Sequence, residues 1–82
     1  LAVEWADRKI RVNAVAPTWV KTDFTRTMLE DPATTEKLLA LMPLHAYADT
    51  ADVAAAVLYL AAPASKMVTG HTLPVDGGYL AK

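Results

Sequence analysis

The sequence predicts an α/β fold in which two strands of a parallel sheet are joined by crossover helices. Two short apolar segments, residues 10–16 and 71–75, have the composition of strands. The longer stretch between them contains start and stop signals typical of helices. A strand, a helical crossover and a second strand form a unit whose two strands run parallel.

The first element is expected to be the end of a helix. Residues 1–9 mix apolar and charged side chains and finish on two basic residues, which suits a helix C-terminus. Residues 10–16 then predict a strand covered on both faces, because Arg11 and Asn13 are the polar exceptions in an apolar run. Pro17 is expected to end this strand, since proline has no N–H to give to a neighbouring strand.

Two helices are predicted next. Residues 23–30 have the pattern of a short helix with Asp23 as its N-cap. Asp31 and Pro32 predict the start of a longer helix, with aspartate as N-cap and proline at the first helical position, and Pro43 is expected to stop it. The apolar side chains of this region either cover a substrate or pack within the chain, and they are Met28, Leu29, Leu38, Leu39 and Met42.

A third helix and a second strand complete the predicted unit. Thr50 is predicted to cap a helix over residues 51–62 that ends near Pro63. This helix is apolar on nearly every side, so we expect a second buried face in addition to the one on the sheet. Gly70 suits a positive φ before the second strand, and an Asp-Gly-Gly turn follows that strand. Because two strands without a polar face do not make a stable sheet, the unit is predicted to be incomplete.

The composition excludes several function classes. The chain has 82 residues, of which 54% are hydrophobic and 21% charged, so we expect one folded domain. Its net charge of −1 comes from 8 basic and 9 acidic side chains without a basic run, so no nucleic-acid partner and no membrane surface is expected. It has no cysteine, and His45 and His71 lack the spacing of metal ligands, so no metal site is predicted.

The N-terminus gives an expectation about location and completeness. No apolar run reaches the length of about 20 residues that a membrane span needs, and no signal peptide pattern is present. We therefore expect a cytoplasmic protein. The chain also opens on a leucine in a helical pattern, which predicts that it is a piece of a longer protein.

Two stretches of the chain resemble the C-terminal region of short-chain dehydrogenases/reductases. Residues 11–22, RVNAVAPTWVKT, resemble a strand and loop whose usual form in the family is N-x-[VI]-x-P-G-x-[VI]-x-T. Residues 52–79 resemble the closing helix and strand, where a VTG…VDGG ending is common. The resemblance implies an incomplete Rossmann-like doubly wound parallel sheet, with residues 1–82 as the C-terminal segment of a single NAD(P)-binding domain.

The resemblance also implies a cofactor site. In the family this loop holds the nicotinamide end of NAD or NADP, so Pro17, Thr18, Val20 and Thr22 are expected to bind the cofactor. The backbone of Val20 and the hydroxyl of Thr22 would meet the carboxamide, and Pro17 would shape the turn. Thr18 stands where glycine is commonest in the family. Trp19 is expected either to bind substrate or to pack the loop onto the body of the protein.

No catalytic residue is predicted within the chain. The family's proton transfer uses a serine and a Tyr-x-x-x-Lys pair, and none of Tyr47, Tyr59 and Tyr79 has a lysine four residues later. The resemblance implies an oxidoreductase that transfers a hydride between NAD or NADP and a small alcohol or carbonyl substrate. The catalytic set would lie upstream, and the isolated chain would be inactive. The alternative is a non-catalytic remnant that serves in assembly or interaction. Residues 51–82 are expected to form the interface of a homotetramer.

Overall fold

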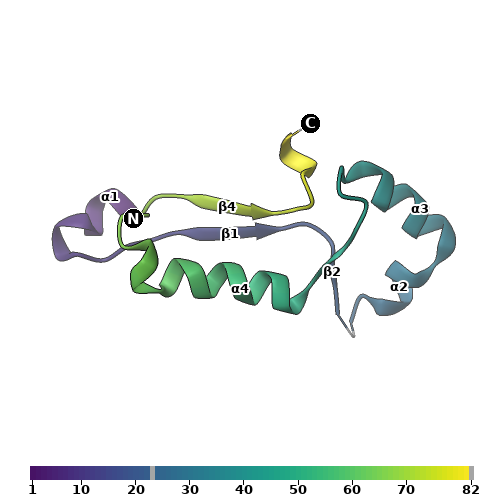
Figure 1. Ribbon diagram of the computed structural model, residues 1–82, viewed down its shortest axis with the longest axis horizontal. Coiled ribbons are helices and arrows are strands. Elements are labelled where there is room, and N and C mark those ends of the chain that lie inside the picture. The colour runs from purple at the N-terminus through teal and green to yellow at the C-terminus, as the bar shows by residue number, and fades with distance from the viewer. Residues whose placement is uncertain (23, 82) are drawn as a thin grey trace.

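The chain forms an elongated α/β arrangement in a computed structural model with extents of 50 × 28 × 20 Å (Figure 1). The structure describes residues 1–22 and 24–81. Asp23, which the sequence predicts as an N-cap, and Lys82 lie outside the described residues. Among the described residues, no helix combines the length and the apolar character needed to cross a membrane.

The main sheet pairs strands from the two ends of the chain. Strand β1 (Ala14–Pro17) lies beside β4 (Thr72–Val75) in parallel orientation (Figure 1). Helix α4, from the segment that joins them, contacts both strands. The predicted parallel strand–crossover–strand unit is therefore confirmed.

The first strand is shorter and begins later than predicted, and Pro17 is its last residue rather than its stop. Proline fits there because its carbonyl can still take part in pairing, and the next N–H, from Thr18, points at the Val75 oxygen at 3.4 Å. The strand is partly exposed, with Ala14 and Pro17 exposed, so the prediction of cover on both faces is wrong for this chain.

The two polar residues before β1 tie it to the segment that precedes β4. The Arg11 guanidinium donates to Ser65 Oγ and to the Val68 carbonyl, both at 3.1 Å. Asn13 donates from its amide nitrogen to the same carbonyl at 2.9 Å and accepts from the His71 N–H at 3.1 Å. These side chains therefore take over part of the pairing where the regular ladder has not yet begun.

The helices that precede α4 in the chain follow the sequence prediction closely. Helix α1 (Ala2–Trp5) runs into a 3₁₀ turn, as the helix end predicted for the first residues. Helix α2 (Arg26–Glu30) is followed at once by α3 (Pro32–Leu41). Asp31 caps α3, because its carboxylate accepts the Thr34 N–H at 3.1 Å.

Helix α4 (Thr50–Ala61) begins one residue earlier than predicted, and its N-cap is Asp49 rather than Thr50. The Asp49 carboxylate accepts the Asp52 N–H, and the Asp52 carboxylate accepts the Asp49 N–H, both at 2.9 Å. This reciprocal arrangement satisfies two N–H groups at the helix start and places negative charge at the positive end of the helix.

A second parallel pair, which the sequence does not predict, joins the loop after β1 to the start of α4. Strand β2 (Val20–Lys21) pairs with β3 (Ala48–Asp49), and the Ala48 N–H donates to the Trp19 carbonyl at 3.1 Å. Each of these strands has two residues, which is too short for an alternating pattern. The pair holds the loop against the first turn of α4.

The buried apolar side chains lie in two places. Leu60 of α4 packs toward the sheet, while Leu29 and Met42 are 2% and 1% exposed at the α2–α3 end of the molecule. Of the two roles left open for the apolar residues of this region, Leu29 and Met42 therefore have the packing role. Met28, in contrast, is 45% exposed.

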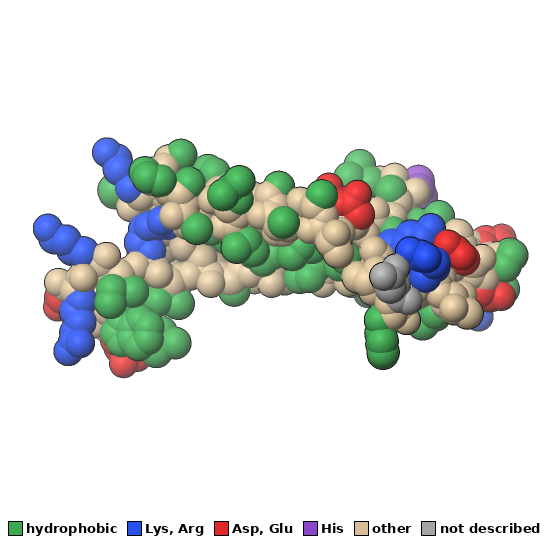
Figure 2. All heavy atoms as spheres, turned by 90° about the horizontal axis from the view of Figure 1, so that it is seen from below, with side chains coloured by type: hydrophobic (Ala, Val, Ile, Leu, Met, Phe, Trp, Pro, Cys, Tyr) green, Lys and Arg blue, Asp and Glu red, His purple; other side chains and the backbone are tan. Residues whose placement is uncertain are grey.

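The outer face of α4 is apolar and exposed. Leu58 is 71% exposed on this face, and Val57 and Tyr59, which flank it on opposite sides of the helix, are 50% and 49% exposed. Figure 2, which views the molecule from the α4 side, shows hydrophobic side chains along the middle of this face and charged ones toward its ends. As predicted, the middle of this helix exposes apolar side chains rather than a polar face.

The turn after β4 is held by one buried carboxylate. Asp76, which is 8% exposed, accepts the N–H groups of Gly78 at 3.0 Å and Leu80 at 3.1 Å. The predicted Asp-Gly-Gly turn is present, and Gly77 and Gly78 both have positive φ in it, at 61° and 93°. The turn leads into a short 3₁₀ helix, Tyr79–Ala81, which reaches the loop after β1.

Candidate functional site

The loop after β1 leaves the sheet at the carboxyl ends of the parallel strands β1 and β4 (Figure 1). In open α/β sheets this is the edge at which ligands bind. Pro17 is the last residue of β1, Val20 lies in β2, and Thr22 follows directly after β2. The predicted cofactor-binding residues thus occupy one short segment that two parallel pairings hold in place.

The main-chain groups of Val20 point away from β3. Successive peptide groups of a strand face opposite edges, and the Trp19 carbonyl already accepts from Ala48 of β3. The Val20 carbonyl accepts instead from the Thr25 hydroxyl, at 2.8 Å. A donor and an acceptor of Val20 are therefore directed to the side of the loop on which Thr22 and Thr25 lie.

Thr22 and Thr25 form a compact pair of hydroxyl groups. Their Oγ1 atoms are 3.2 Å apart, and the Thr22 N–H donates to Thr25 Oγ1 at 2.9 Å. The Thr25 N–H in turn points at Thr22 Oγ1 at 3.3 Å. Both residues are half-buried, so the Thr22 hydroxyl is held in place by its neighbours. The sequence analysis missed Thr25.

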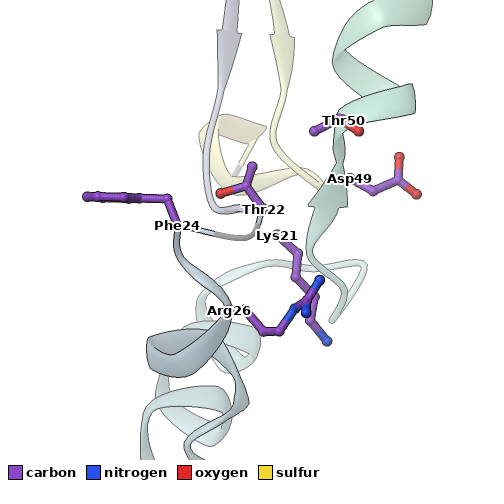
Figure 3. A pocket seen from close by; sticks show the side chains of 6 residues that line it. All are labelled: Lys21, Thr22, Phe24, Arg26, Asp49 and Thr50. Carbon is purple, nitrogen blue, oxygen red and sulfur yellow. The ribbon is translucent and has the colours of Figure 1, made fainter.

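A pocket of about 620 Å³ opens between this loop and the start of α4 (Figure 3). Phe24 is 97% exposed and points away from the other labelled side chains (Figure 3). The Lys21 ammonium lies 3.6 Å from the Glu30 carboxylate, and both are about half-exposed, so this ion pair adds little stability. The side chains that line the pocket are Lys21, Thr22, Phe24, Arg26, Asp49 and Thr50.

Thr18 and Trp19 belong to a second, apolar pocket of about 300 Å³. Its other lining residues are Leu41, at the end of α3, and Tyr79, in the C-terminal 3₁₀ helix. The Thr18 hydroxyl donates to the Met42 sulfur at 3.5 Å, so its side chain is turned away from Thr22. Trp19 is 39% exposed and is therefore available to a ligand in this pocket.

Among residues 1–22 and 24–81, no cluster of histidine and carboxylate side chains has the arrangement of a metal site. His45 and His71 are both exposed. The Tyr47 hydroxyl is buried and has no hydrogen-bond partner in the described part of the chain. Tyr47 also lines a further pocket, with Asp52 and Asp76, beside the turn after β4.

Comparison with known proteins shows the family to which this chain is related. The chain matches the family model described as enoyl-(acyl carrier protein) reductase over residues 1–80. It is 48% identical over 79 residues to the galactitol 2-dehydrogenase (L-tagatose-forming) of Cereibacter sphaeroides, covering 96% of this chain and 31% of that protein. It is 46% identical over 80 residues to the L-xylulose reductase of Mesocricetus auratus, covering 98% of this chain and 33% of that protein.

Solved structures give the same result for the fold. The structure of 4-hydroxyisoleucine dehydrogenase complexed with NADH matches with a TM-score of 0.93 at 25% identity, over 99% of this chain and 33% of that one. The structure of ElxO with NADP bound matches with a TM-score of 0.88 at 35% identity, over 99% of this chain and 33% of that one. The chain spans about a third of the length of the relatives it matches.

These matches agree with the α/β fold and its parallel strands. The chain belongs to the short-chain dehydrogenase/reductase family. The incomplete doubly wound sheet expected from the sequence is confirmed by the structural matches.

Proposed function

We propose that residues 1–82 are the C-terminal segment of a single NAD(P)-binding domain in an oxidoreductase. The enzyme transfers a hydride between the nicotinamide of NAD or NADP and a small alcohol or carbonyl compound. A polyol or ketose is the favoured substrate class, because relatives with 48% and 46% identity are named galactitol 2-dehydrogenase and L-xylulose reductase. The nucleotides named with the matching structures, NADH and NADP, support the choice of cofactor.

One observation carries this proposal. The Val20 main chain and the Thr22 hydroxyl face the same side of a loop at the carboxyl edge of parallel strands. A carboxamide needs a donor and acceptors in one plane, which a main-chain N–H, a carbonyl and a hydroxyl can supply. Pro17 would fix the exit from β1, and Thr18 would continue the binding loop. Trp19 would contact the substrate from the neighbouring apolar pocket.

The proton-transfer residues are proposed to lie outside this chain, in a portion of the protein N-terminal to it. When bound, the nicotinamide supplies or accepts the hydride. The residues of this chain would orient the ring through its carboxamide, and the orientation decides which face of the ring meets the substrate. The chain's contribution to catalysis is therefore positioning.

We expect Thr22→Val in the full-length protein to raise the KM for NAD or NADP. The substitution keeps the β-branched shape and removes one hydrogen-bonding group, whose net contribution is about 0.5–1.5 kcal/mol. This corresponds to about a 2- to 10-fold rise in KM, measured by initial rates at varied cofactor concentration.

Thr27→Val provides the matched control, because Thr27 is an exposed threonine of α2 that lies outside the proposed site. It should leave the KM unchanged. A Thr22→Val enzyme with wild-type KM and kcat for the cofactor would show that this loop does not hold the carboxamide.

We also propose that residues 51–82 form a subunit interface in a homotetramer. The outer face of α4 exposes Ala55 and Leu58, with Tyr59 beside them, and no charged residue stands among these three. A two-fold axis lets one such patch serve both subunits. Charged side chains toward the ends of the face would form the polar rim of this interface (Figure 2).

A further inference from the structure

We infer that Thr25 is a positioning residue that fixes which groups of the carboxamide site donate hydrogen bonds and which accept them, an inference that rests on the proposed function. Among residues 1–22 and 24–81, its hydroxyl contacts both proposed partners of the carboxamide, the Val20 carbonyl and the Thr22 hydroxyl. Thr25 Oγ1 lies 2.8 Å from the Val20 carbonyl oxygen, 2.9 Å from the Thr22 nitrogen and 3.2 Å from Thr22 Oγ1. Thr25 thus connects the main-chain half of the site with its hydroxyl half.

The directions of these hydrogen bonds follow from counting protons. A threonine hydroxyl has one proton and two lone pairs. The proton of Thr25 goes to the Val20 carbonyl, which is its shortest contact with a group that can only accept. Thr25 Oγ1 then accepts from the Thr22 N–H with one lone pair and from the Thr22 hydroxyl with the other.

The Thr22 hydroxyl is left with a defined role. Its proton is used on Thr25 Oγ1, and one of its lone pairs, at 3.3 Å, shares the Thr25 N–H with the Thr22 main-chain carbonyl, at 3.2 Å. One acceptor lone pair remains for a ligand, and the Val20 carbonyl also keeps one. The loop therefore presents two acceptors to the NH₂ group of a carboxamide, while the Val20 N–H is the donor for its oxygen.

This polarity gives the ring a preferred orientation. A carboxamide rotated by about 180° would place its oxygen against the Thr22 hydroxyl oxygen and the Val20 carbonyl. The hydrogen bonds from its NH₂ group to these two acceptors would then be lost. Without the Thr25 hydroxyl, the Thr22 proton has no fixed partner and can turn toward the ligand. Thr22 would then be able to donate as well as accept, and the site would no longer distinguish an NH₂ group from a group that cannot donate.

The test compares the natural dinucleotide with acetylpyridine adenine dinucleotide, in which a methyl ketone replaces the carboxamide. The full-length enzyme is assayed as wild type, Thr25→Val, Thr25→Ser and Thr27→Val, and the KM of each is measured for both dinucleotides. We expect Thr25→Val to raise the KM for the natural dinucleotide about 3- to 10-fold and that for the ketone less than about 2-fold. The ratio of the KM for the ketone dinucleotide to the KM for the natural dinucleotide should therefore be smaller in Thr25→Val than in the wild type. Thr25→Ser should have the wild-type ratio, and so should Thr27→Val.

An unchanged ratio in Thr25→Val would overturn the inference, and so would equal losses with both dinucleotides, which would indicate a structural role only. Thr25→Ala serves as a second hydroxyl-free variant if the valine variant does not fold. Thr22→Val separates this inference from the proposed function. If Thr22→Val narrows the ratio and Thr25→Val does not, the inference on Thr25 is wrong. If Thr22→Val also leaves the ratio unchanged, the proposed function of the loop is wrong.

Discussion

The isolated 82-residue chain is expected to show no dehydrogenase or reductase turnover with either nicotinamide cofactor. None of Tyr47, Tyr59 and Tyr79 is followed by a lysine at the fourth position, so the proton-transfer pair of the family is missing from the sequence. A positioned acid–base group contributes about 10²–10⁴-fold to the rate of such reactions. The measurement follows NAD(P)H absorbance with a panel of sugars, polyols and secondary alcohols, including galactitol and L-xylulose.

The full-length protein, assayed in the same way, is the positive control. Turnover that co-purifies with the isolated chain, with a KM for the cofactor that rises in Thr22→Val, would contradict this expectation. Absence of turnover in both proteins would favour the alternative, a non-catalytic assembly module. Activity of the full-length protein alone is the outcome that the proposal requires.

A single charge on the outer face of α4 is expected to split the assembly of the full-length protein. Ala55 and Leu58 are exposed on this face, and glutamate at either position would be buried without a partner in the proposed interface. An unpaired buried charge costs several kcal/mol, so each substitution should raise the dissociation constant at least about 100-fold. Light scattering at micromolar concentration should then give a lower mass for Ala55→Glu and Leu58→Glu than for the wild type.

The same charge on an exposed alanine of another helix is the matched control. Ala40→Glu in α3 should leave the mass unchanged, because α3 lies at the far end of the molecule from the middle of α4 (Figure 1). A monomeric wild type, or a tetramer that keeps its mass in both α4 variants, would show that the apolar face of α4 has another role.

Features of the fold that depend on neighbouring residues could be predicted from the sequence. Asp31 and Pro32 stand side by side as cap and first helical residue, and the structure confirms α3 at that point. Gly70 has the positive φ of 72° that its place before β4 suggests. In both cases the residues that form the sequence pattern are the same ones that form the local structure.

Features that depend on distant residues were missed. Asp49 and Thr50 are both suitable N-caps, and pairing of Asp49 with Lys21 in β2 keeps Asp49 extended and outside α4. The strand prediction for residues 10–16 failed at its start: the regular ladder begins at Ala14, and before it Arg11 and Asn13 bond through their side chains to Val68, in the segment that precedes β4. A local pattern contains no information on either contact.

The candidate site also contains residues that could be predicted from a local motif and one that could not. Val20 and Thr22 could be proposed because they lie within one continuous motif, RVNAVAPTWVKT. Thr25 lies outside that motif, and its contact with the Val20 carbonyl at 2.8 Å exists because the chain turns back after Thr22. A threonine three residues after another is common in loops and predicts no such contact by itself.

The position of the nicotinamide carboxamide in a crystal structure of the full-length protein with its cofactor tests the central claim most directly. We expect the carboxamide nitrogen within about 3.2 Å of Thr22 Oγ1 and of the Val20 carbonyl, and the carboxamide oxygen within that distance of the Val20 N–H. A carboxamide bound with its oxygen toward Thr22, or a nicotinamide ring bound away from this loop, would contradict the account.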